Sequence, residues 1–311
     1  MRIIKETHIK FSSQRKYGFL LSGFILLAGV LSLVLNGGPK LSIDFKGGTL
    51  VSVKYTENVD VNDVRDVLSN INIEGQTFDF SSGEIKHFGG LSQISVRLPH
   101  FDNEPENFTR KIVNYLYESF PEKAPADQAD FLLGSYRVGP KIGAELSGKA
   151  FMAILSALGL ILLYISFRFE FKFALGAIAA LAHDILITLG LFSLLGYEIS
   201  LPIIAAFLTI VGYSLNDTIV IFDRIRENAK TAKRKPFNEI IDSSINNSLS
   251  RTFITSITTF MVVFVLWLVG GQVIHNFAFA MMVGVIVGTY SSIYIASPIV
   301  LLLHGEIPSK K

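Results

Sequence analysis

Three ionisable side chains stand within or beside long apolar segments of the sequence. Asp184 follows His183 near the middle of one segment, Asp217 follows Asn216 in the next, and Arg251 opens a third. A charged group is costly in hydrocarbon, so such residues usually face the interior of a helix bundle and mark an ion or substrate route. A buried carboxylate near a cation can bind and release a proton after small rearrangements, because burial favours its neutral form and the cation favours its charged form.

Asp217 and Arg251 are expected to meet at the same depth of the bundle. The segment that holds Asp217 ends near Asp223, which places Asp217 about 9 Å from that end at about 1.5 Å per residue. The following segment begins from the same side near Arg251, so an Asp–Arg pair would offset part of the cost of burial. Two roles stay open for Asp217: a titrating carboxylate, or one half of a purely structural ion pair.

Small and hydroxyl side chains recur at helical spacing around these groups. Stripes of small residues, such as the one with Gly284 and Gly288, let helices approach closely, and hydroxyls bond across them. The hydroxyls near Arg251 fit either helix packing or a lining for water and protons, and His183 is interpreted as a hydrogen-bonded packing residue. The predicted auxiliary polar network consists of Asp184, His183, Asn216, Tyr213, Thr252 and Thr255.

Composition excludes several classes of protein. Of the 311 residues, 50% are hydrophobic and only 17% are charged, whereas a soluble domain has about 25% charged residues. A net charge of +2 provides no basic domain for binding nucleic acid. The absence of cysteine excludes disulfides, thiolate zinc sites and cysteine nucleophiles. No metal or organic cofactor is expected.

One enzyme motif is nearly complete in the sequence, and the protease motifs are absent. Gly143 and the pair Gly148-Lys149 match the phosphate-binding pattern G-x-x-x-x-G-K, but Ala150 stands where Ser or Thr must hold magnesium. The sequence has no His-Glu-x-x-His, and its apolar segments contain no Gly-x-Gly-Asp or Gly-x-Ser-Gly motif. Hydrolysis needs a nucleophile or an activated water, so we expect a protein that is not an enzyme.

Six apolar segments approach the length of about 20 residues that a helix needs to cross a bilayer. The first is predicted to be an uncleaved anchor, because its apolar run from Phe19 to Leu35 exceeds that of a signal peptide and the following Asn36–Pro39 lacks a cleavage pattern. The predicted spans are 17–36, 150–167, 173–195, 200–222, 252–270 and 276–303.

The distribution of Lys and Arg predicts the orientation of these spans. Cationic residues gather at both termini and in the connections after the second and fourth spans, while the short turns at 196–200 and 270–275 have none. All cationic segments share one side if both termini are cytoplasmic. The expected organisation is a cytoplasmic tail 1–16, a first helix 17–36, an outer domain 37–146, five further helices within 147–303 with a cytoplasmic loop 224–248, and a tail 304–311.

The long connection between the first two spans is expected to fold as a domain. Residues 37–146 hold 16 acidic and 11 basic residues and no apolar run of membrane length. Alternating and amphipathic patterns follow the order β-α-β-β-α-β, which predicts a ferredoxin-like α+β unit, with Asp60 as the N-cap of its first helix. The expected strands are 50–55, 76–80, 93–98 and 131–138, and the expected helices are 61–71 and 106–120.

Longer strings of the sequence resemble one known family. Gly212–Asn228, which begins Gly-Tyr-Ser-Leu-Asn-Asp, resembles the fourth-span signature of the SecF family of bacterial protein-export membrane proteins. Ser248–Ser256 is similar to the fifth span of that family, and Ile43–Thr49 is similar to the motif that opens its outer domain. The resemblance covers the whole chain, and further matching strings are Val138–Pro140 and Ala182–Asp184.

The resemblance implies a role in protein export. The chain would form half of an RND-like bundle in the bacterial inner membrane, with its large loop in the periplasm, and SecD would supply the other half. Together they would assist the SecYEG translocon, with YajC as a further candidate partner, in drawing unfolded polypeptide outward by using the proton-motive force. In this interpretation Asp217 binds the proton and Arg251 stabilises its charged form. Membrane lipid is an expected partner, and nucleic acid is not.

Two other functions stay open. An RND-like proton-coupled exporter of small molecules or lipids would need a substrate cavity in larger outer domains. A non-catalytic subunit that only scaffolds SecD or the translocon would need Asp217 and Arg251 only as a structural ion pair. Proton uptake by vesicles with and without Asp217→Asn would separate the scaffold from the proton-driven subunit.

Overall fold

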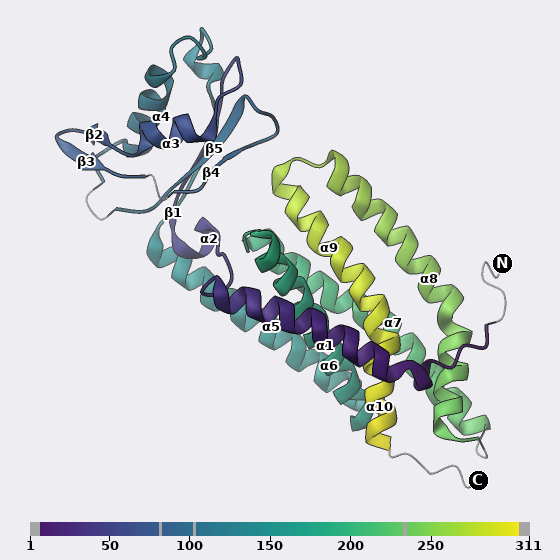
Figure 1. Ribbon diagram of the computed structural model, residues 1–311. Coiled ribbons are helices and arrows are strands. Elements are labelled where there is room, and N and C mark those ends of the chain that lie inside the picture. The colour runs from purple at the N-terminus through teal and green to yellow at the C-terminus, as the bar shows by residue number, and fades with distance from the viewer. Residues whose placement is uncertain (1–6, 81–82, 102–103, 233–234, 305–311) are drawn as a thin grey trace. The chain divides into compact units, whose positions relative to one another are not determined.

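The computed structural model describes residues 7–80, 83–101, 104–232 and 235–304 (Figure 1). The chain forms two compact units, each with its own hydrophobic core. The α+β unit is Leu41–Ala150, and the helical unit combines the residues up to Lys40 with those from Phe151 onward. The predicted outer domain, 37–146, has nearly these limits. The predicted tails, 1–16 and 304–311, lie partly outside the described residues.

The helical unit is built from long apolar helices. Within the described residues, six are long and apolar enough to cross a membrane, the last of them running over Ile274–His304. This confirms the six-span fold expected from hydropathy. The elements are α1 (Phe11–Leu35), α5 (Pro140–Arg168), α6 (Phe171–Leu195), α7 (Leu201–Thr231), α8 (Phe237–Val269), α9 (Gln272–Ser291), the π-helical turn η2 (Ser292–Ala296) and α10 (Ser297–His304).

Several helices extend well beyond the predicted spans. The expected loop 224–248 is wrong as a loop, because α7 continues to Thr231 and α8 begins at Phe237. Ile225, Ile240 and Ile241 are buried in these extensions, so one apolar face continues after the fully apolar run has ended. Hydropathy finds the part of a helix that is apolar all round and misses amphipathic extensions. Asp223 therefore lies within α7, where it pairs with Arg168 at 3.0 Å.

Glycines set the closest approaches between helices. A Cβ atom on Gly29 of α1 would stand 2.8 Å from the Cα atom of Gly190 on α6. A Cβ atom on Gly284 or Gly288 of α9 would stand 2.3 Å or 2.9 Å from a side-chain carbon of α7. Such distances leave no room for a side chain. The small-residue stripe of the sixth span is therefore a packing surface against α7.

We expect Gly29→Ala and Gly23→Ala to change the free energy of unfolding in different directions, although both glycines lie on α1. Gly29→Ala forces α1 away from α6 and should lower the free energy of unfolding by about 1–3 kcal/mol. Gly23 has open space around its Cα atom, so Gly23→Ala should be neutral or slightly stabilising. Thermal unfolding of the purified chain in detergent would measure both, and equal effects would contradict the assigned helix crossing.

The last span contains a local change of helix type. Residues Ser292–Ala296 form a π-helical turn, and the Ser297 hydroxyl donates to the carbonyl of Ser292 at 2.8 Å. Pro298 follows and has no N–H group for the carbonyl four residues earlier, which is a common cause of such irregularity. The turn begins directly after Ser291, so it lies beside the polar groups described below.

The α+β unit contains a four-stranded antiparallel sheet with strand order β4-β5-β1-β6. The central strand β1 pairs Thr49 with Leu98 of β5 and Gly48 with Val138 of β6. This order, with α3 and α4 as crossovers, is the ferredoxin-like arrangement predicted from the sequence. The elements are α2 (Ile43–Lys46), β1 (Gly48–Lys54), α3 (Val61–Leu68), β2 (Ile71–Ile73), β3 (Gln76–Phe78), β4 (Ile85–His87), β5 (Gln93–Leu98), α4 (Phe108–Ser119), η1 (Gln128–Asp130) and β6 (Leu132–Val138).

One predicted strand belongs to another sheet. Residues 76–80 were expected to form the second strand of the fold, but β3 pairs only with β2 in a separate hairpin. The second strand is the three-residue β4, whose length gives too little alternation to be recognised. Ile71 lies in β2 and not in the preceding helix, which ends at Leu68. Asp60 caps that helix as predicted, accepting a bond from the backbone N–H of Asn62 at 2.7 Å.

Two adjacent glycines join α2 to the sheet. Gly47 and Gly48 have φ angles of 76° and 126°, which side chains rarely tolerate. A Cβ atom on Gly47 would stand 2.8 Å from Pro140, and one on Gly48 would stand 2.6 Å from the carbonyl oxygen of Leu98. Gly143, in the segment resembling a phosphate-binding loop, lies inside α5, so that segment forms a regular helix.

Tyr55 should make the α+β unit less stable in alkali. Its hydroxyl donates to the carbonyl of Leu116 at 3.3 Å, and burial raises its pKa above the ordinary value of 10.0. Below pH 10 both folded and unfolded chains keep the phenol neutral, whereas above it only the unfolded chain ionises. The stabilisation by neutral Tyr55 is therefore lost as the pH rises past about 10.

Tyr55→Phe should remove the loss of stability above about pH 10. At neutral pH it should lower the free energy of unfolding by about 1 kcal/mol, because the hydrogen bond of the hydroxyl is missing. Urea unfolding of the excised α+β unit between about pH 7 and 11 would measure it, with the half-exposed Tyr136→Phe as the matched control. Parallel curves for the wild type and Tyr55→Phe above pH 10 would contradict this assignment.

Candidate functional site

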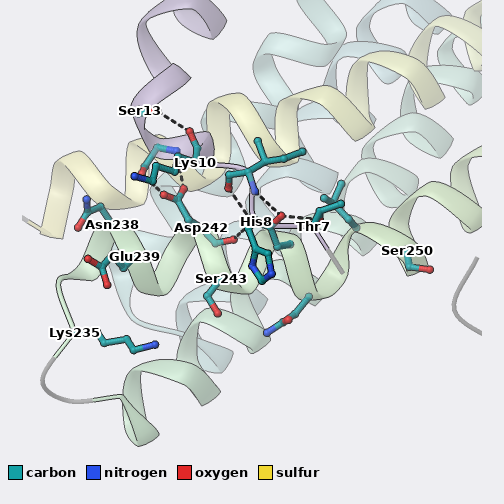
Figure 2. Close-up of a pocket in the computed structure, with 15 residues that line it drawn as sticks. Thr7, His8, Lys10, Ser13, Lys235, Asn238, Glu239, Asp242, Ser243 and Ser250 are labelled. Atoms are coloured by element: carbon teal, nitrogen blue, oxygen red, sulfur yellow. Dashed lines mark hydrogen bonds between the residues drawn. The ribbon is translucent and has the colours of Figure 1, made fainter. Parts of the chain in front are cut away.

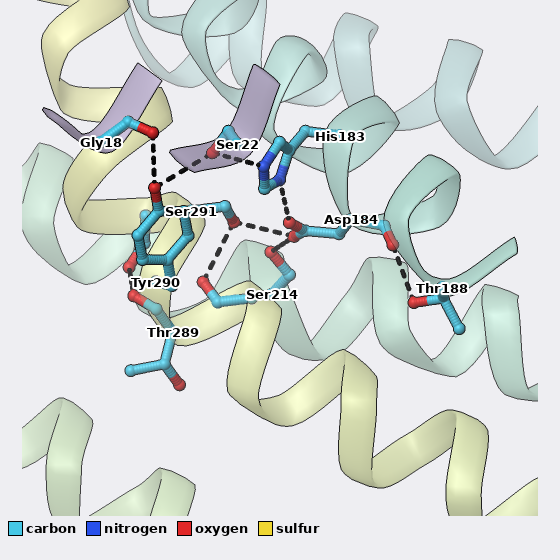
Figure 3. A network of polar contacts seen from close by, with 11 residues as sticks. Gly18, Ser22, His183, Asp184, Thr188, Ser214, Thr289, Tyr290 and Ser291 are labelled. Carbon is cyan, nitrogen blue, oxygen red and sulfur yellow. Dashed lines mark hydrogen bonds and ion pairs between the residues drawn. The ribbon is translucent and has the colours of Figure 1, made fainter. Parts of the chain in front are cut away.

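Asp184 is the most enclosed carboxylate of the helical unit. It lies on α6 with 0% of its surface exposed, and its Oδ2 atom accepts bonds from Ser214 of α7 at 2.6 Å and from Ser291 of α9 at 2.9 Å (Figure 3). Its Oδ1 atom lies 3.0 Å from Nδ1 of His183. A buried carboxylate is costly unless its lone pairs are occupied, and three neighbours meet that need here.

His183 connects this carboxylate to α1. Its Nε2 atom lies 2.9 Å from the hydroxyl of Ser22, which in turn lies 3.0 Å from the hydroxyl of Tyr290. The Tyr290 hydroxyl donates to the backbone carbonyl of Gly18 at 2.7 Å. Figure 3 shows these groups as one continuous chain of polar contacts. Side chains or carbonyls from four helices, α1, α6, α7 and α9, therefore share one buried hydrogen-bond network.

Asp217 lies one turn further along α7, and 3% of its surface is exposed. Its Oδ2 atom accepts a long bond of 3.4 Å from Ser256 of α8, whose hydroxyl also lies 2.6 Å from that of Thr289 on α9. Its carboxylate is thus less completely bonded than that of Asp184. A carboxylate held by hydroxyls, without a direct cation, can exchange a proton with modest rearrangement of its neighbours.

The predicted contact between Asp217 and Arg251 is not formed. Among the described residues no ion pair joins them within 4.0 Å, and Arg251 of α8 is exposed in this chain. The Arg251 charge and the Thr255 hydroxyl still interact electrostatically with the Asp217 carboxylate. The position of a residue along a helix does not fix the direction in which its side chain points around the helix axis. Ser256 occupies the position facing Asp217 that the sequence interpretation gave to Arg251.

The other predicted polar residues have different surroundings. Asn216 is exposed, and Thr255 donates to the backbone carbonyls of Arg251 and Thr252. Within the part of the chain that the structure describes, the buried hydroxyls of Tyr213 and Thr252 have no hydrogen-bond partner. These two groups keep unused donor and acceptor capacity near Asp217.

Serines and one threonine supply most of the bonds that the sequence interpretation missed. Ser214 lies three residues before Asp217, and Ser256 lies four residues after Thr252, so helical spacing was an available signal. Serine is too common and too small to be singled out without knowing its neighbours. The hydroxyl residues found only from the structure are Ser22, Ser214, Ser256, Thr289 and Ser291.

Comparison with known proteins decides the family. The family model described as "Protein export membrane protein SecD/SecF, C-terminal" matches residues 124–306, and the "SecD/SecF GG Motif" matches residues 33–59. The chain belongs to the SecD/SecF family. The resemblance inferred from the sequence is confirmed, and the GG motif contains the Gly47–Gly48 junction described above. Members of this family are translocase subunits and not classical enzymes.

Individual relatives extend over the whole chain. The protein translocase subunit SecF of Rhodothermus marinus is 41% identical over 317 residues, covering 100% of this chain and 98% of that protein. The SecF of Vibrio alginolyticus is 42% identical over 302 residues, covering 96% and 90%. This chain is a multi-pass membrane protein by its six apolar helices and its family.

A solved structure of a longer relative has a similar fold. The crystal structure of SecDF from Thermus thermophilus, described as a translocon-associated membrane protein, is 38% identical with a TM-score of 0.82. The match covers 96% of this chain and 39% of the SecDF chain. The region similar to this SecD/SecF-family chain is therefore about two fifths of that larger protein.

A polar cleft at one end of the helical unit has a structural role. It has a volume of about 570 Å³ and lies between residues 7–13 and the first turns of α8 (Figure 2). Asp242 of α8 accepts bonds from the backbone N–H and the hydroxyl of Ser12, each at 2.7 Å. Asn246 bonds Thr7 and the backbone of Ile9. A carboxylate on α8 thus caps the first turn of α1 and fixes α1 on α8.

Proposed function

We propose that this chain is the SecF subunit of the bacterial Sec export machinery and uses the proton-motive force to promote polypeptide translocation. SecD is its proposed partner, and this rests on the SecDF relatives, in which a region similar to this chain is part of one longer chain. The SecYEG translocon, with YajC as a further candidate, and a translocating unfolded polypeptide complete the proposed set of partners. The proposed location is the inner membrane.

Asp217 is the observation that carries the proton-coupling part of the proposal. It is a carboxylate with 3% exposure, inside a bundle, held by a hydroxyl of another helix and within electrostatic reach of Arg251. Protonation removes its charge and turns one oxygen from an acceptor into a donor. Moving one charge through the membrane potential supplies about 2.3 kcal/mol per 100 mV, which can bias that step.

The neighbours of Asp217 indicate how protonation reaches the rest of the bundle. Ser256 of α8 lies between Asp217 of α7 and Thr289 of α9, so a change at the carboxylate alters bonds among three helices. Repacking of α7, α8 and α9 is the proposed response. α5 runs without a break from Pro140, in the α+β unit, to Arg168, in the helical unit.

Asp217→Asn should abolish the proton-driven part of export. Asparagine keeps the shape but cannot ionise, so secretion should fall to the rate of cells lacking the subunit while binding to SecD survives. Arg251→Met should act in the same direction, and the double variant should be little worse than either, as expected for two residues in one unit. Asp223→Asn, on the same helix and paired with Arg168, is the matched control and should retain export.

The same variants decide among the alternative functions. Secretion at the wild-type rate with Asp217→Asn would contradict proton coupling through this residue. Loss of SecD binding in that variant would favour a scaffold held by structural polar contacts. Proton-dependent efflux of small molecules, without any effect on secretion, would favour an exporter.

The orientation can be tested by labelling, because the chain has no cysteine of its own. Glu57→Cys in the α+β unit should react with an impermeant thiol reagent in cells with a permeable outer membrane. Thr231→Cys, at the end of α7, should react only after the inner membrane is opened. Both side chains are exposed in this chain. The opposite labelling pattern would place the α+β unit in the cytoplasm and reverse the proposed topology.

A further inference from the structure

The direction of each hydrogen bond around His183 can be worked out from the groups at the end of the network. The backbone carbonyl of Gly18 can only accept, so the Tyr290 hydroxyl uses its single proton in donating to it at 2.7 Å. Tyr290 has no second proton for Ser22. In the 3.0 Å contact between the two hydroxyls, Ser22 is therefore the donor and Tyr290 the acceptor.

This fixes the proton on one ring nitrogen of His183. Ser22 has spent its only proton on Tyr290, so its oxygen can only accept in the 2.9 Å contact with Nε2 of His183. With both contacts counted as hydrogen bonds, Nε2 carries a hydrogen. In a neutral imidazole only one of the two nitrogens carries a hydrogen, so Nδ1 has a free lone pair unless the ring is charged.

The contacts of Asp184, the other member of the pair, leave one position for a further proton, between its Oδ1 atom and Nδ1 of His183. Asp184 Oδ2 accepts from the hydroxyls of Ser214 and Ser291, so a hydrogen on Oδ2 would displace one of these bonds. Oδ1 faces Nδ1 of His183 at 3.0 Å. Two atoms with only lone pairs would repel at this distance, and a single proton between them turns the contact into a hydrogen bond.

We propose that His183 and Asp184 together bind one dissociable proton in addition to the single hydrogen of a neutral imidazole, at a site separate from Asp217. When the site is occupied, one hydrogen lies on Nε2 and one lies between Nδ1 and Oδ1. The hydrogen between Nδ1 and Oδ1 belongs formally either to an imidazolium beside a carboxylate or to a carboxylic acid beside a neutral imidazole. Both descriptions give the pair no net charge, which suits a site with 5% and 0% exposure for its two members.

Release of this proton reverses part of the network. The hydrogen on Nε2 leaves, so the pair has a net charge of −1 and the neutral ring keeps its single hydrogen on Nδ1, pointing at the carboxylate. Nε2 has become an acceptor, so Ser22 turns its hydroxyl from Tyr290 to His183. One proton leaves to water or to the next acceptor, and no other atom is gained or lost. Binding or release of the proton therefore changes the hydrogen bond between Ser22 of α1 and Tyr290 of α9.

The groups facing the pair contain no other carboxylate or cation in direct contact. Among the described residues, α1 contributes Ser22, α7 contributes Ser214, and α9 contributes Tyr290 and Ser291. Tyr290, which stacks on the His183 ring at 6.1 Å, is the one titratable group among these four. The nearest charged side chain along α7 is Asp217, three residues after Ser214.

The two helices that donate hydrogen bonds to Asp184, α7 and α9, also carry Asp217 or a hydroxyl linked to it. α7 carries Ser214 and Asp217 on one face. α9 carries Ser291 two residues after Thr289, whose hydroxyl lies 2.6 Å from that of Ser256, the neighbour of Asp217. A shift of either helix changes both sites. Placing the His183–Asp184 proton on the transport route rests on the function proposed above, whereas the existence of the proton site does not.

Nitrogen NMR of ¹⁵N-histidine in the full chain, reconstituted in lipid nanodiscs, tests the site directly. His183→Gln identifies the signals of His183 by their loss. With the site occupied, Nε2 should carry a hydrogen and Nδ1 should share one, and raising the pH should move the ring in one step to the neutral form with its hydrogen on Nδ1. A ring that keeps this neutral form throughout about pH 5 to 8 would overturn the proposal.

Two variants test the assigned partners. Asp184→Asn cannot share the proton and should remove the transition. Ser22→Ala removes the acceptor of the Nε2 hydrogen and should change the His183 signals. Ser32→Ala is its matched control, because Ser32 also lies on α1 and bonds a serine of α6, Ser193, outside the network. Equal effects of Ser22→Ala and Ser32→Ala would overturn the assignment.

A last comparison separates this proposal from the proposed function. In Asp217→Asn the His183 transition should persist even though proton-driven export is lost, and its disappearance would contradict a proton site that is independent of Asp217. The Asp184→Asn variant should bind SecD yet show secretion with an altered pH profile. An unchanged profile in this variant would contradict a place on the route while the NMR result still decides whether the proton site exists.

Discussion

The cost of burying two carboxylates in an apolar bundle is the constraint on which the helical unit depends. Asp184 and Asp217 are almost fully enclosed, so each needs donors from helices other than its own. Ser214, Ser291 and Ser256 supply them, but serine side chains are short and reach only if the helices nearly touch. Glycines at the crossings of α1 with α6 and of α7 with α9 allow that approach.

Hydroxyl groups make this enclosure adaptable. A serine or tyrosine hydroxyl can donate or accept, so a chain of them can reverse direction without moving its heavy atoms far. An N–H group of an amide can only donate, so it would stabilise only the charged form of a neighbouring carboxylate. The π-helical turn directly after Ser291 adds a second source of adaptability, because its hydrogen bonds differ from those of a regular helix. Charge, hydroxyl orientation and helix packing are therefore linked in one region of the bundle.

The α+β unit is organised on a different principle. Its core is apolar and is formed by the inner faces of the sheet with α3 and α4. Its special positions are backbone ones, at Gly47 and Gly48, where Pro140 and the carbonyl of Leu98 leave no space for side chains. Those contacts hold the start of α5 against the sheet. By contrast only 6% of the apolar window of α5 is buried, so most of its surface is free for lipid or another chain.

The sequence alone determined the six spans, the ferredoxin-like order of the α+β unit and the family, because apolar length, alternation and long motifs are properties of consecutive residues. It also identified Asp184 and Asp217 as costly charges. Only the tertiary structure decided which groups meet. Ser256 and not Arg251 contacts Asp217, and β4 and not β3 joins the main sheet. Rotation about a helix axis and pairing between strands depend on packing with distant residues, which local patterns do not record.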